Sequence, residues 1–226
     1  MLYSADIFSS DGLFLLLMRK IIRIIFFQLF IRPLLVFFVG VRVSGRENIP
    51  LNGSFIIAAN HSSHLDTLVL MNLLPVKQLN RIRPVAAADY FMRNPIIYFL
   101  SCLFFNIIPI ERIKISRGNN PLEVLLAALN RGENLIMFPE GTRCKDLESG
   151  EFHSGIAHVA EQLPQVCVVP VYLANMNRAL PKGEIFLVPF ICEVHIGHPL
   201  WLKGTKEEKM KVLKDEILKL KGNAKW

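Results

Sequence analysis

From Gly45 onward the chain alternates short apolar runs with amphipathic segments, and this alternation limits the possible folds more than any other feature of the sequence. Short apolar runs bounded by turn residues are typical of buried strands, whereas apolar residues spaced three and four apart indicate helices. Together they predict an α/β domain with a mixed, mostly parallel sheet flanked by helices. Its expected extent is residues 45–226, and a 226-residue chain with 52% hydrophobic content can fill the core of one such domain.

The expected strands are residues 54–59, 83–87, 106–110, 134–138, 167–172 and 191–196, and the expected helices are 65–74, 90–103, 121–130 and 155–162. The helix at 121–130 has the clearest end signals. Asn120 can cap it, Pro121 suits its first position, and Gly132 follows its end.

A mostly apolar segment from Leu13 to Val41 precedes this domain, and charged residues interrupt it repeatedly. Its longest uncharged run, residues 33–41, is shorter than the roughly 20 residues that a spanning helix needs. The region contains no acid from Gly12 on, and an apolar segment with basic residues suits an anionic membrane surface better than a nucleic acid. The basic residues are Arg19, Lys20, Arg23, Arg32, Arg42 and Arg46.

We therefore expect residues 1–44 to form membrane-anchoring helices that lie in the interface and break at Pro33. A helical hairpin buried in the soluble core is the alternative, and a tilted insertion also stays open. At the other end, residues 203–226 place Met210, Leu213, Ile217 and Leu220 at helical spacing among many lysines. This amphipathic helix could pack on the domain or make a second membrane contact.

The four cysteines contain no C-x-x-C pair, and Asp6 and Asp11 occupy the place of the basic region of a secretory signal. These features favour a reducing compartment, where disulfides are rare. Combined with the basic apolar segment, they predict a protein on the cytoplasmic face of the inner or cell membrane.

His61 and Asp66 directly follow the predicted strand 54–59. If the chain turns at once into a helix, the carboxylate can reach the imidazole, fix its tautomer and raise the basicity of the other ring nitrogen, as a general base requires. Two plainer interpretations remain. His61 could cap the helix with Asp66 as a first-turn acid, or His61 and His64 could begin a metal site, for which no Cys or His cluster supplies further ligands, so no metal is expected.

A second polar loop follows another predicted strand. The stretch NLIMFPEGTR, residues 134–143, ends in Glu140, Gly141, Thr142 and Arg143. Ligands of open α/β sheets bind outside the carboxyl ends of the strands, so the two loops are expected to share one cleft. A plain turn would explain the Pro and Gly equally well if this loop stood alone.

Two sequence blocks, NHSSHLD at 60–66 and FPEGTR at 138–143, resemble the first and third signature blocks of the glycerolipid acyltransferases, which include lysophosphatidate acyltransferase. IPIER at 108–112 is similar to the second block, VVPV at 168–171 to the fourth, and GRENIP at 45–50 to the approach to the first strand. The likeness covers residues 45 to about 200, and two blocks in the right order make it specific.

The resemblance implies transfer of a fatty acyl group from acyl-CoA or acyl carrier protein, as co-substrate and without a cofactor, to the free hydroxyl of a membrane lysophospholipid, most simply 1-acylglycerol-3-phosphate. His61 would be the general base and Asp66 its partner. The substrate-binding residues would be Arg112 and Arg143 on the phosphate, Glu140 on the glycerol hydroxyls, Gly141 near the thioester oxyanion, and Thr142 beside them.

The sequence departs from the family at two places, because His153 stands where many members carry lysine and Cys144 where serine is common. Three other functions remain open: acyl transfer to another lysolipid, thioester hydrolysis, and lipid binding without catalysis. The absence of a G-x-S-x-G motif favours direct attack by the acceptor rather than an acyl-enzyme.

Overall fold

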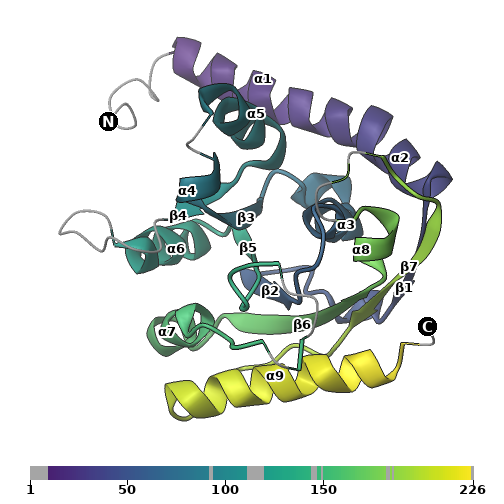
Figure 1. Cartoon of the computed structure of the whole chain (residues 1–226). Coiled ribbons are helices and arrows are strands. Elements are labelled where there is room, and N and C mark those ends of the chain that lie inside the picture. Colours follow the sequence, from purple (N-terminus) through teal and green to yellow (C-terminus); the bar gives the residue numbers. More distant parts are fainter. Residues whose placement is uncertain are drawn as a thin grey trace.

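The structure is a computed structural model that describes residues 10–91, 94–110, 120–143, 147–148, 150–181, 184 and 186–224. Its centre is a seven-stranded sheet of order β1-β7-β6-β2-β5-β3-β4 (Figure 1). Neighbouring strands are parallel except for the β6–β7 pair. The mixed, mostly parallel sheet is therefore confirmed. The strands are β1 (Val39–Ser44), β2 (Phe55–Ala59), β3 (Ile82–Ala87), β4 (Ile108–Ile110), β5 (Asn134–Met137), β6 (Cys167–Ala174) and β7 (Phe190–Ile196).

All six strands expected from the sequence are present, and β1 is an additional one at the sheet edge. The expected boundary after residue 44 is wrong, because β1 pairs along its length with β7 and belongs to the sheet. Its residues alternate in the manner of a strand, with Val39, Val41 and Val43 separated by Gly40 and Arg42. This two-residue alternation is short and directly follows a long apolar segment, so it is not recognisable as a strand in the sequence.

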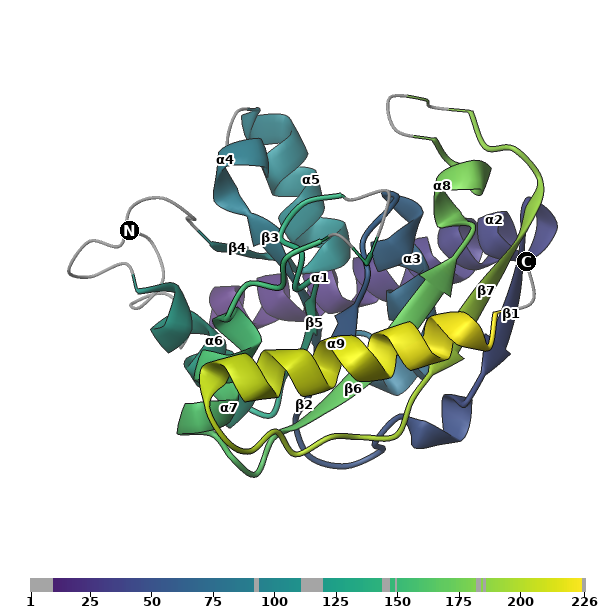
Figure 2. The same cartoon turned by 60° about the horizontal axis from the view of Figure 1, so that its bottom comes forward.

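Helices cover both faces of the sheet, and α1 and α9 lie on opposite sides of it in both views (Figures 1 and 2). The larger core joins the N-terminal helices, α3 and the sheet, and the smaller core joins α6, α7 and α9 to the other face. The helices are α1 (Ser10–Phe26), α2 (Arg32–Phe37), α3 (Leu65–Leu73), α4 (Ala88–Phe91), α5 (Pro95–Phe105), α6 (Pro121–Asn130), α7 (Gly155–Gln162), α8 (Met176–Ala179) and α9 (Lys206–Gly222), with short turns η1 (Phe27–Ile31), η2 (Arg46–Asn48) and η3 (Val76–Gln78).

Helices α3, α6 and α7 confirm the sequence prediction, but the single helix expected at 90–103 is wrong. The chain forms α4 and then α5. Asn94 has extended backbone angles and accepts from the amides of Ile96 and Ile97, and Pro95 follows at the first helical position. A residue before proline is disfavoured in the helical region, so a new helix starts here.

The N-terminal helices do not break at Pro33, contrary to the sequence prediction. The residues that join α1, η1 and α2 all have right-handed helical angles. The Arg32 amide donates to the carbonyl of Phe27, five residues back, and this wider π-type turn accommodates a proline that has no N–H. The helical segment buries Phe27, Ile31 and Leu35 in the core.

Arg23 is not a membrane-facing cation, contrary to the grouping of basic residues in the sequence. It is 4% exposed, and its guanidinium donates to Asn80 Oδ1 and to the carbonyls of Cys102 and Leu103. The last carbonyls of a helix lack partners within it, so Arg23 of α1 caps the end of α5. Burial and, to a smaller extent, the nearby Arg83 and Arg19 lower the pKa of Arg23 to about 10.

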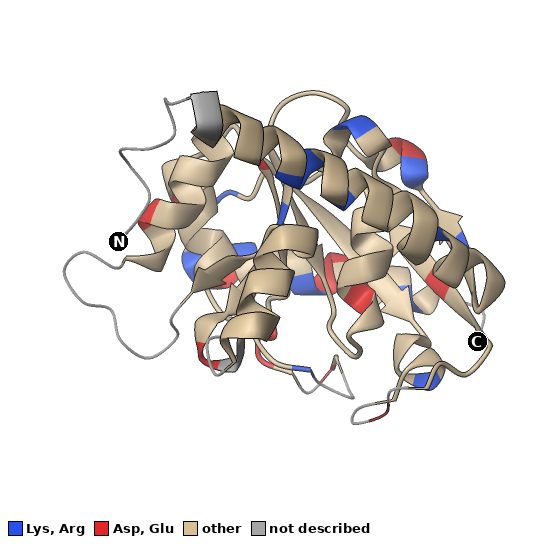
Figure 3. Cartoon of the chain, turned by 90° about the horizontal axis from the view of Figure 1, so that it is seen from above, with Lys and Arg blue, Asp and Glu red and all other residues tan. Residues whose placement is uncertain are grey.

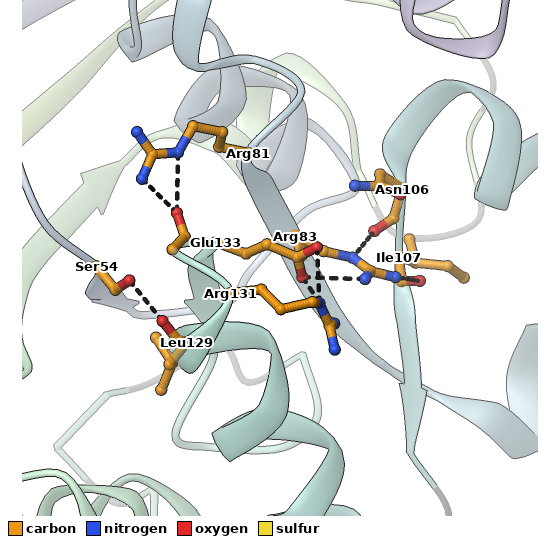
Figure 4. Close-up of polar contacts among 9 residues, drawn as sticks. Ser54, Arg81, Arg83, Asn106, Ile107, Leu129, Arg131 and Glu133 are labelled. Atoms are coloured by element: carbon orange, nitrogen blue, oxygen red, sulfur yellow. Dashed lines mark hydrogen bonds and ion pairs between the residues drawn. The ribbon is translucent and has the colours of Figure 1, made fainter. Parts of the chain in front are cut away.

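Arg83 makes the corresponding connection from the sheet. Its guanidinium donates to the carbonyls of Asn106 and Ile107 and forms an ion pair with Glu133 at 3.1 Å (Figure 4). This one side chain therefore ties β3 to the segment that leads into β4 and to the residue just before β5.

Helix α9 packs on the domain, which was one of the two interpretations of residues 203–226. Met210, Leu213 and Ile217 are buried in the smaller core. Thr205 and Glu208 form a capping box at its start, which fixes where the helix begins. Across the described residues, no helix is long and apolar enough to cross a bilayer.

Candidate active site

The two polar loops follow neighbouring strands. Strands β2 and β5 run parallel, with Ala58 opposite Met137, so their carboxyl ends meet at one edge of the sheet. The loop after β2 carries His61, and the loop after β5 carries Gly141. The expected shared cleft is confirmed, because both residues line a single cavity of about 1110 Å³.

His61 and Asp66 are in contact, as their spacing predicts. The distance from His61 Nδ1 to Asp66 Oδ2 is 2.8 Å, and Asp66 is fully buried at the start of α3. The same carboxylate oxygen also accepts from the amides of Ser62 and Ser63, at 2.6 and 2.8 Å. Because Asp66 engages Nδ1, the ring nitrogen left to take a proton from a substrate is Nε2.

The backbone around His61 is held on both sides. Buried Asn60 accepts from the amide of Leu173 and donates to its carbonyl, which joins the end of β2 to β6. Ser63 Oγ donates to the carbonyl of Leu180 at 3.0 Å. These contacts hold the backbone that carries the His61 side chain. A fixed position suits a general base, which must meet its substrate in one geometry.

Residues 138–141 form a β-turn, closed by the Gly141 amide on the Phe138 carbonyl at 3.0 Å. Gly141 has φ +68°, a conformation that favours glycine. The ring of Phe138 stacks on that of His61, with centroids 4.1 Å apart and planes 18° apart. The loop after β5 therefore supports, through Phe138, the imidazole of His61 in the loop after β2.

The cavity has a polar end and an apolar wall. Gly141, Thr142 and Arg143 line it together with His61, whereas Glu140 is 5% exposed and is not among the described lining residues. Arg112, the other expected phosphate ligand, lies outside the described residues. The apolar wall comes from α3, β3, α5, α6 and the segment that leads into β4, and includes Leu68, Val85, Phe105, Ile107, Leu122 and Leu125.

His64 adds a second imidazole to the polar end. Burial, followed by the nearby Arg143 and His61, lowers the pKa of His64 below its usual value. Arg143 and His61 thus each interact electrostatically with His64, and all three residues line the same cavity.

Several residues of the site do not follow from the sequence reasoning. The stack of Phe138 on His61 depends on strand order, which no local pattern reveals. The clamp by Asn60 links residues 113 positions apart. His153 and His158 also line the cavity. Of the two, only His153 had a signal in the sequence, because it follows the FPEGTR block at a position where many similar proteins carry lysine.

Solved structures include a similar fold. The crystal structure of the 1-acyl-sn-glycerophosphate (LPA) acyltransferase PlsC from Thermotoga maritima superposes with a TM-score of 0.66 at 21% sequence identity, over 92% of this chain and 88% of that one. At this level of identity the likeness establishes the α/β fold.

Curated relatives are similar over most of the chain. The 1-acyl-sn-glycerol-3-phosphate acyltransferase alpha of Bos taurus is 27% identical over 180 residues, covering 79% of this chain and 60% of the relative. The 1-acyl-sn-glycerol-3-phosphate acyltransferase of Borreliella burgdorferi is 25% identical over 186 residues, covering 80% and 71%. This chain thus spans about 60% of the length of the mammalian relatives it matches.

A family model described as Acyltransferase matches residues 40–174. That match covers more than half of the chain and contains both polar loops, from the His61–Asp66 pair to the Phe138–Gly141 turn. The chain therefore belongs to the Acyltransferase family.

Proposed function

We propose that this protein transfers a fatty acyl group from an acyl thioester, acyl-CoA or acyl carrier protein, to the free hydroxyl of 1-acylglycerol-3-phosphate, giving phosphatidate. The observation that carries the proposal is the 2.8 Å contact between His61 Nδ1 and fully buried Asp66, at the wall of a cavity large enough for lipid groups. Family membership and the names of the relatives support this reaction class.

In the proposed reaction, His61 Nε2 takes the proton of the acceptor hydroxyl as its oxygen attacks the thioester carbonyl. The tetrahedral oxyanion then collapses, the carbon–sulfur bond breaks, and the thiolate recovers the proton from His61. Asp66 keeps the imidazole oriented and stabilises its positive charge. Oxyanion stabilisation by amides near Gly141, typically worth about 3 kcal/mol, completes the proposal.

The cavity supports assignments for the two ends of the lipid substrate. Arg143, with Arg112 from the loop outside the described residues, would bind the phosphate, since a guanidinium matches that anion in shape and charge. Thr142 would lie beside the glycerol. Buried Glu140 would act by holding the loop rather than by touching the glycerol hydroxyls directly. The apolar wall would accept an acyl chain.

The N-terminal helices would bring the enzyme to its substrate at the membrane surface. Figure 3 looks down on α1, whose ribbon is tan apart from a few blue segments. A lysolipid is held in the bilayer by its acyl chain, at about 0.8 kcal/mol per buried methylene, so the protein must go to the lipid. The exposed apolar residues on α1, η1 and α5 are Leu13, Phe14, Leu15, Leu16, Leu17, Ile21, Ile22, Ile25, Leu29, Phe30, Ile96, Ile97, Phe99 and Leu100.

The test is a product assay with purified protein, labelled acyl-CoA or acyl carrier protein, and a set of lysolipid acceptors. We expect labelled phosphatidate as the main product, and a loss of at least about 100-fold in turnover for His61→Ala. His198→Ala is the matched control, because His198 is exposed and does not line the cavity. Free fatty acid as the main product would instead identify a thioester hydrolase, and a His61→Ala variant with most of its activity would exclude the proposed base.

A further inference from the structure

His153 is a fixed part of the cavity wall. Its amide donates to the carbonyl of Pro139 at 2.8 Å, and the next residue, Ser154, directly precedes α7. On the other side, Phe152 packs against the smaller core, and Lys214 Nζ donates to the carbonyl of Gly150 at 2.9 Å. Contacts on both sides therefore hold the backbone of an exposed histidine.

The ring of His153 lies against the turn that supports the proposed base. A methyl group placed on Gly141 would lie 2.7 Å from Cδ2 and 3.0 Å from Nε2 of His153. At the other end of the same turn, Phe138 stacks on His61. The first and last residues of a β-turn lie within about 7 Å of each other. Two imidazoles thus flank one turn in one cavity.

Most of the polar side chains around His153 can donate hydrogen bonds to an anion. Among the described residues that line the cavity, the cationic or titratable basic groups are His61, His64, Arg143, His153 and His158, and the carboxylate is that of Asp89. The ring of His153 lies against Gly141, and Arg143 follows Gly141 by two residues in the chain. Both side chains line the same cavity, so one anion bound beside this turn would meet a guanidinium and an imidazole.

We infer that His153 binds the phosphate of the lysolipid acceptor together with Arg143 and so selects anionic acceptors over uncharged ones. The inference rests on the proposed function for the identity of the acceptor. An imidazole N–H donates one hydrogen bond to a phosphate oxygen, and such a charge-assisted bond is shorter and stronger than one between neutral groups. His153 is a specificity determinant in this assignment and takes no part in the proton transfer at His61.

The test measures binding of two ligands with the same acyl chain, lysophosphatidate and monoacylglycerol, in mixed micelles by titration calorimetry. For His153→Ala we expect about 10- to 100-fold weaker binding of lysophosphatidate, the range for one hydrogen bond to a charged group, and an unchanged affinity for monoacylglycerol. His153→Lys should restore most of the lost affinity, because an ammonium also binds phosphate. His198→Ala should match the unmodified protein.

Equal losses for both ligands, or no loss for lysophosphatidate, would overturn the inference. Circular dichroism and the restoration by His153→Lys separate a specific effect from misfolding. A kinetic arm distinguishes the two proposals: His153→Ala should raise KM for lysophosphatidate and leave kcat nearly unchanged. If the unmodified protein transfers no acyl group but binds lysophosphatidate through His153, the proposed function fails and the phosphate contact stands.

Discussion

The imidazole of His61 lies flat on the ring of Phe138, with centroids 4.1 Å apart and planes inclined by 18°. Asp66 holds one edge of the same imidazole through Nδ1. The stack fixes the plane of the ring, and the hydrogen bond fixes its rotation within that plane. The two loops after β2 and β5 are therefore mechanically joined at the proposed base, and each should affect turnover.

Removal of the Phe138 ring tests this joining. Phe138→Ala should lower kcat by about 10-fold or more, because a base that is free to tilt loses part of the advantage of a fixed orientation. The KM for the lysolipid should change less. Phe186→Ala is a suitable control, since Phe186 is 78% exposed and does not line the cavity. An unchanged kcat in Phe138→Ala would show that Asp66 alone orients the base.

The carboxylate of Asp66 is tested by Asp66→Asn. The amide oxygen could still accept from the amides of Ser62 and Ser63, but the side chain would no longer supply a carboxylate for His61. We expect a loss in kcat on the order of 10,000-fold, as when a His–Asp pair loses its charge and preferred tautomer. Circular dichroism should report an intact fold. A loss below 10-fold would mean that Asp66 serves mainly to cap the loop.

The strands of the sheet and the polar loops at their ends can be predicted from the sequence because each depends on local signals. Apolar runs such as 134–137 end at turn residues, and polar side chains follow at once. The packing of the N-terminal segment on the domain cannot be predicted in this way. Whether Arg23 faces lipid or caps α5 depends on a helix about eighty residues later, and the strand pattern of β1 is too short to stand out from the apolar residues around it.

The site was only partly predictable for the same reason. His61, Asp66 and Gly141 lie next to strand ends and could be named from spacing. The contact of His153 with Gly141 and the clamp of Asn60 on Leu173 depend on how loops from different strands fold back over the sheet. Arg112 stays a prediction, because it lies outside the described residues.

The pH dependence of stability should carry a contribution from His64. Burial lowers its pKa in the folded protein from the ordinary value of 6.5. As the pH falls below about 6.5, the unfolded chain therefore binds more protons at this residue than the folded chain does. The free energy of unfolding consequently decreases as the pH decreases. His64→Gln should lose less stability than the unmodified protein between pH 7.5 and 5.5 in urea titrations. Parallel losses would mean that His64 is equally solvated in both states.

The connection between α1 and α5 should contribute to stability through one arginine. Arg23→Ala would remove the buried donor of Asn80 Oδ1 and of the Leu103 carbonyl in the last turn of α5, at a cost of about 2 to 3 kcal/mol in the free energy of unfolding. Arg19→Ala, one turn earlier on α1 at an exposed position, should change stability by less than about 0.5 kcal/mol. Equal effects in urea titrations would contradict the capping role of Arg23.

Membrane attachment is best tested by substitutions on α1, because deleting residues 1–44 would also remove core residues such as Phe27 and Leu35 and the whole of strand β1. A triple variant with Phe14, Leu17 and Ile21 changed to Asp keeps the buried side of α1. It replaces apolar contact with the bilayer by charges that anionic lipids repel, so co-sedimentation with phosphatidylglycerol vesicles should fall by at least 10-fold. Val212→Asp, at an exposed apolar position on α9, is the control and should sediment like the unmodified protein. Because the three substituted side chains are exposed, the triple variant should unfold at nearly the same temperature as the unmodified protein. Undiminished sedimentation would place the attachment elsewhere on the protein.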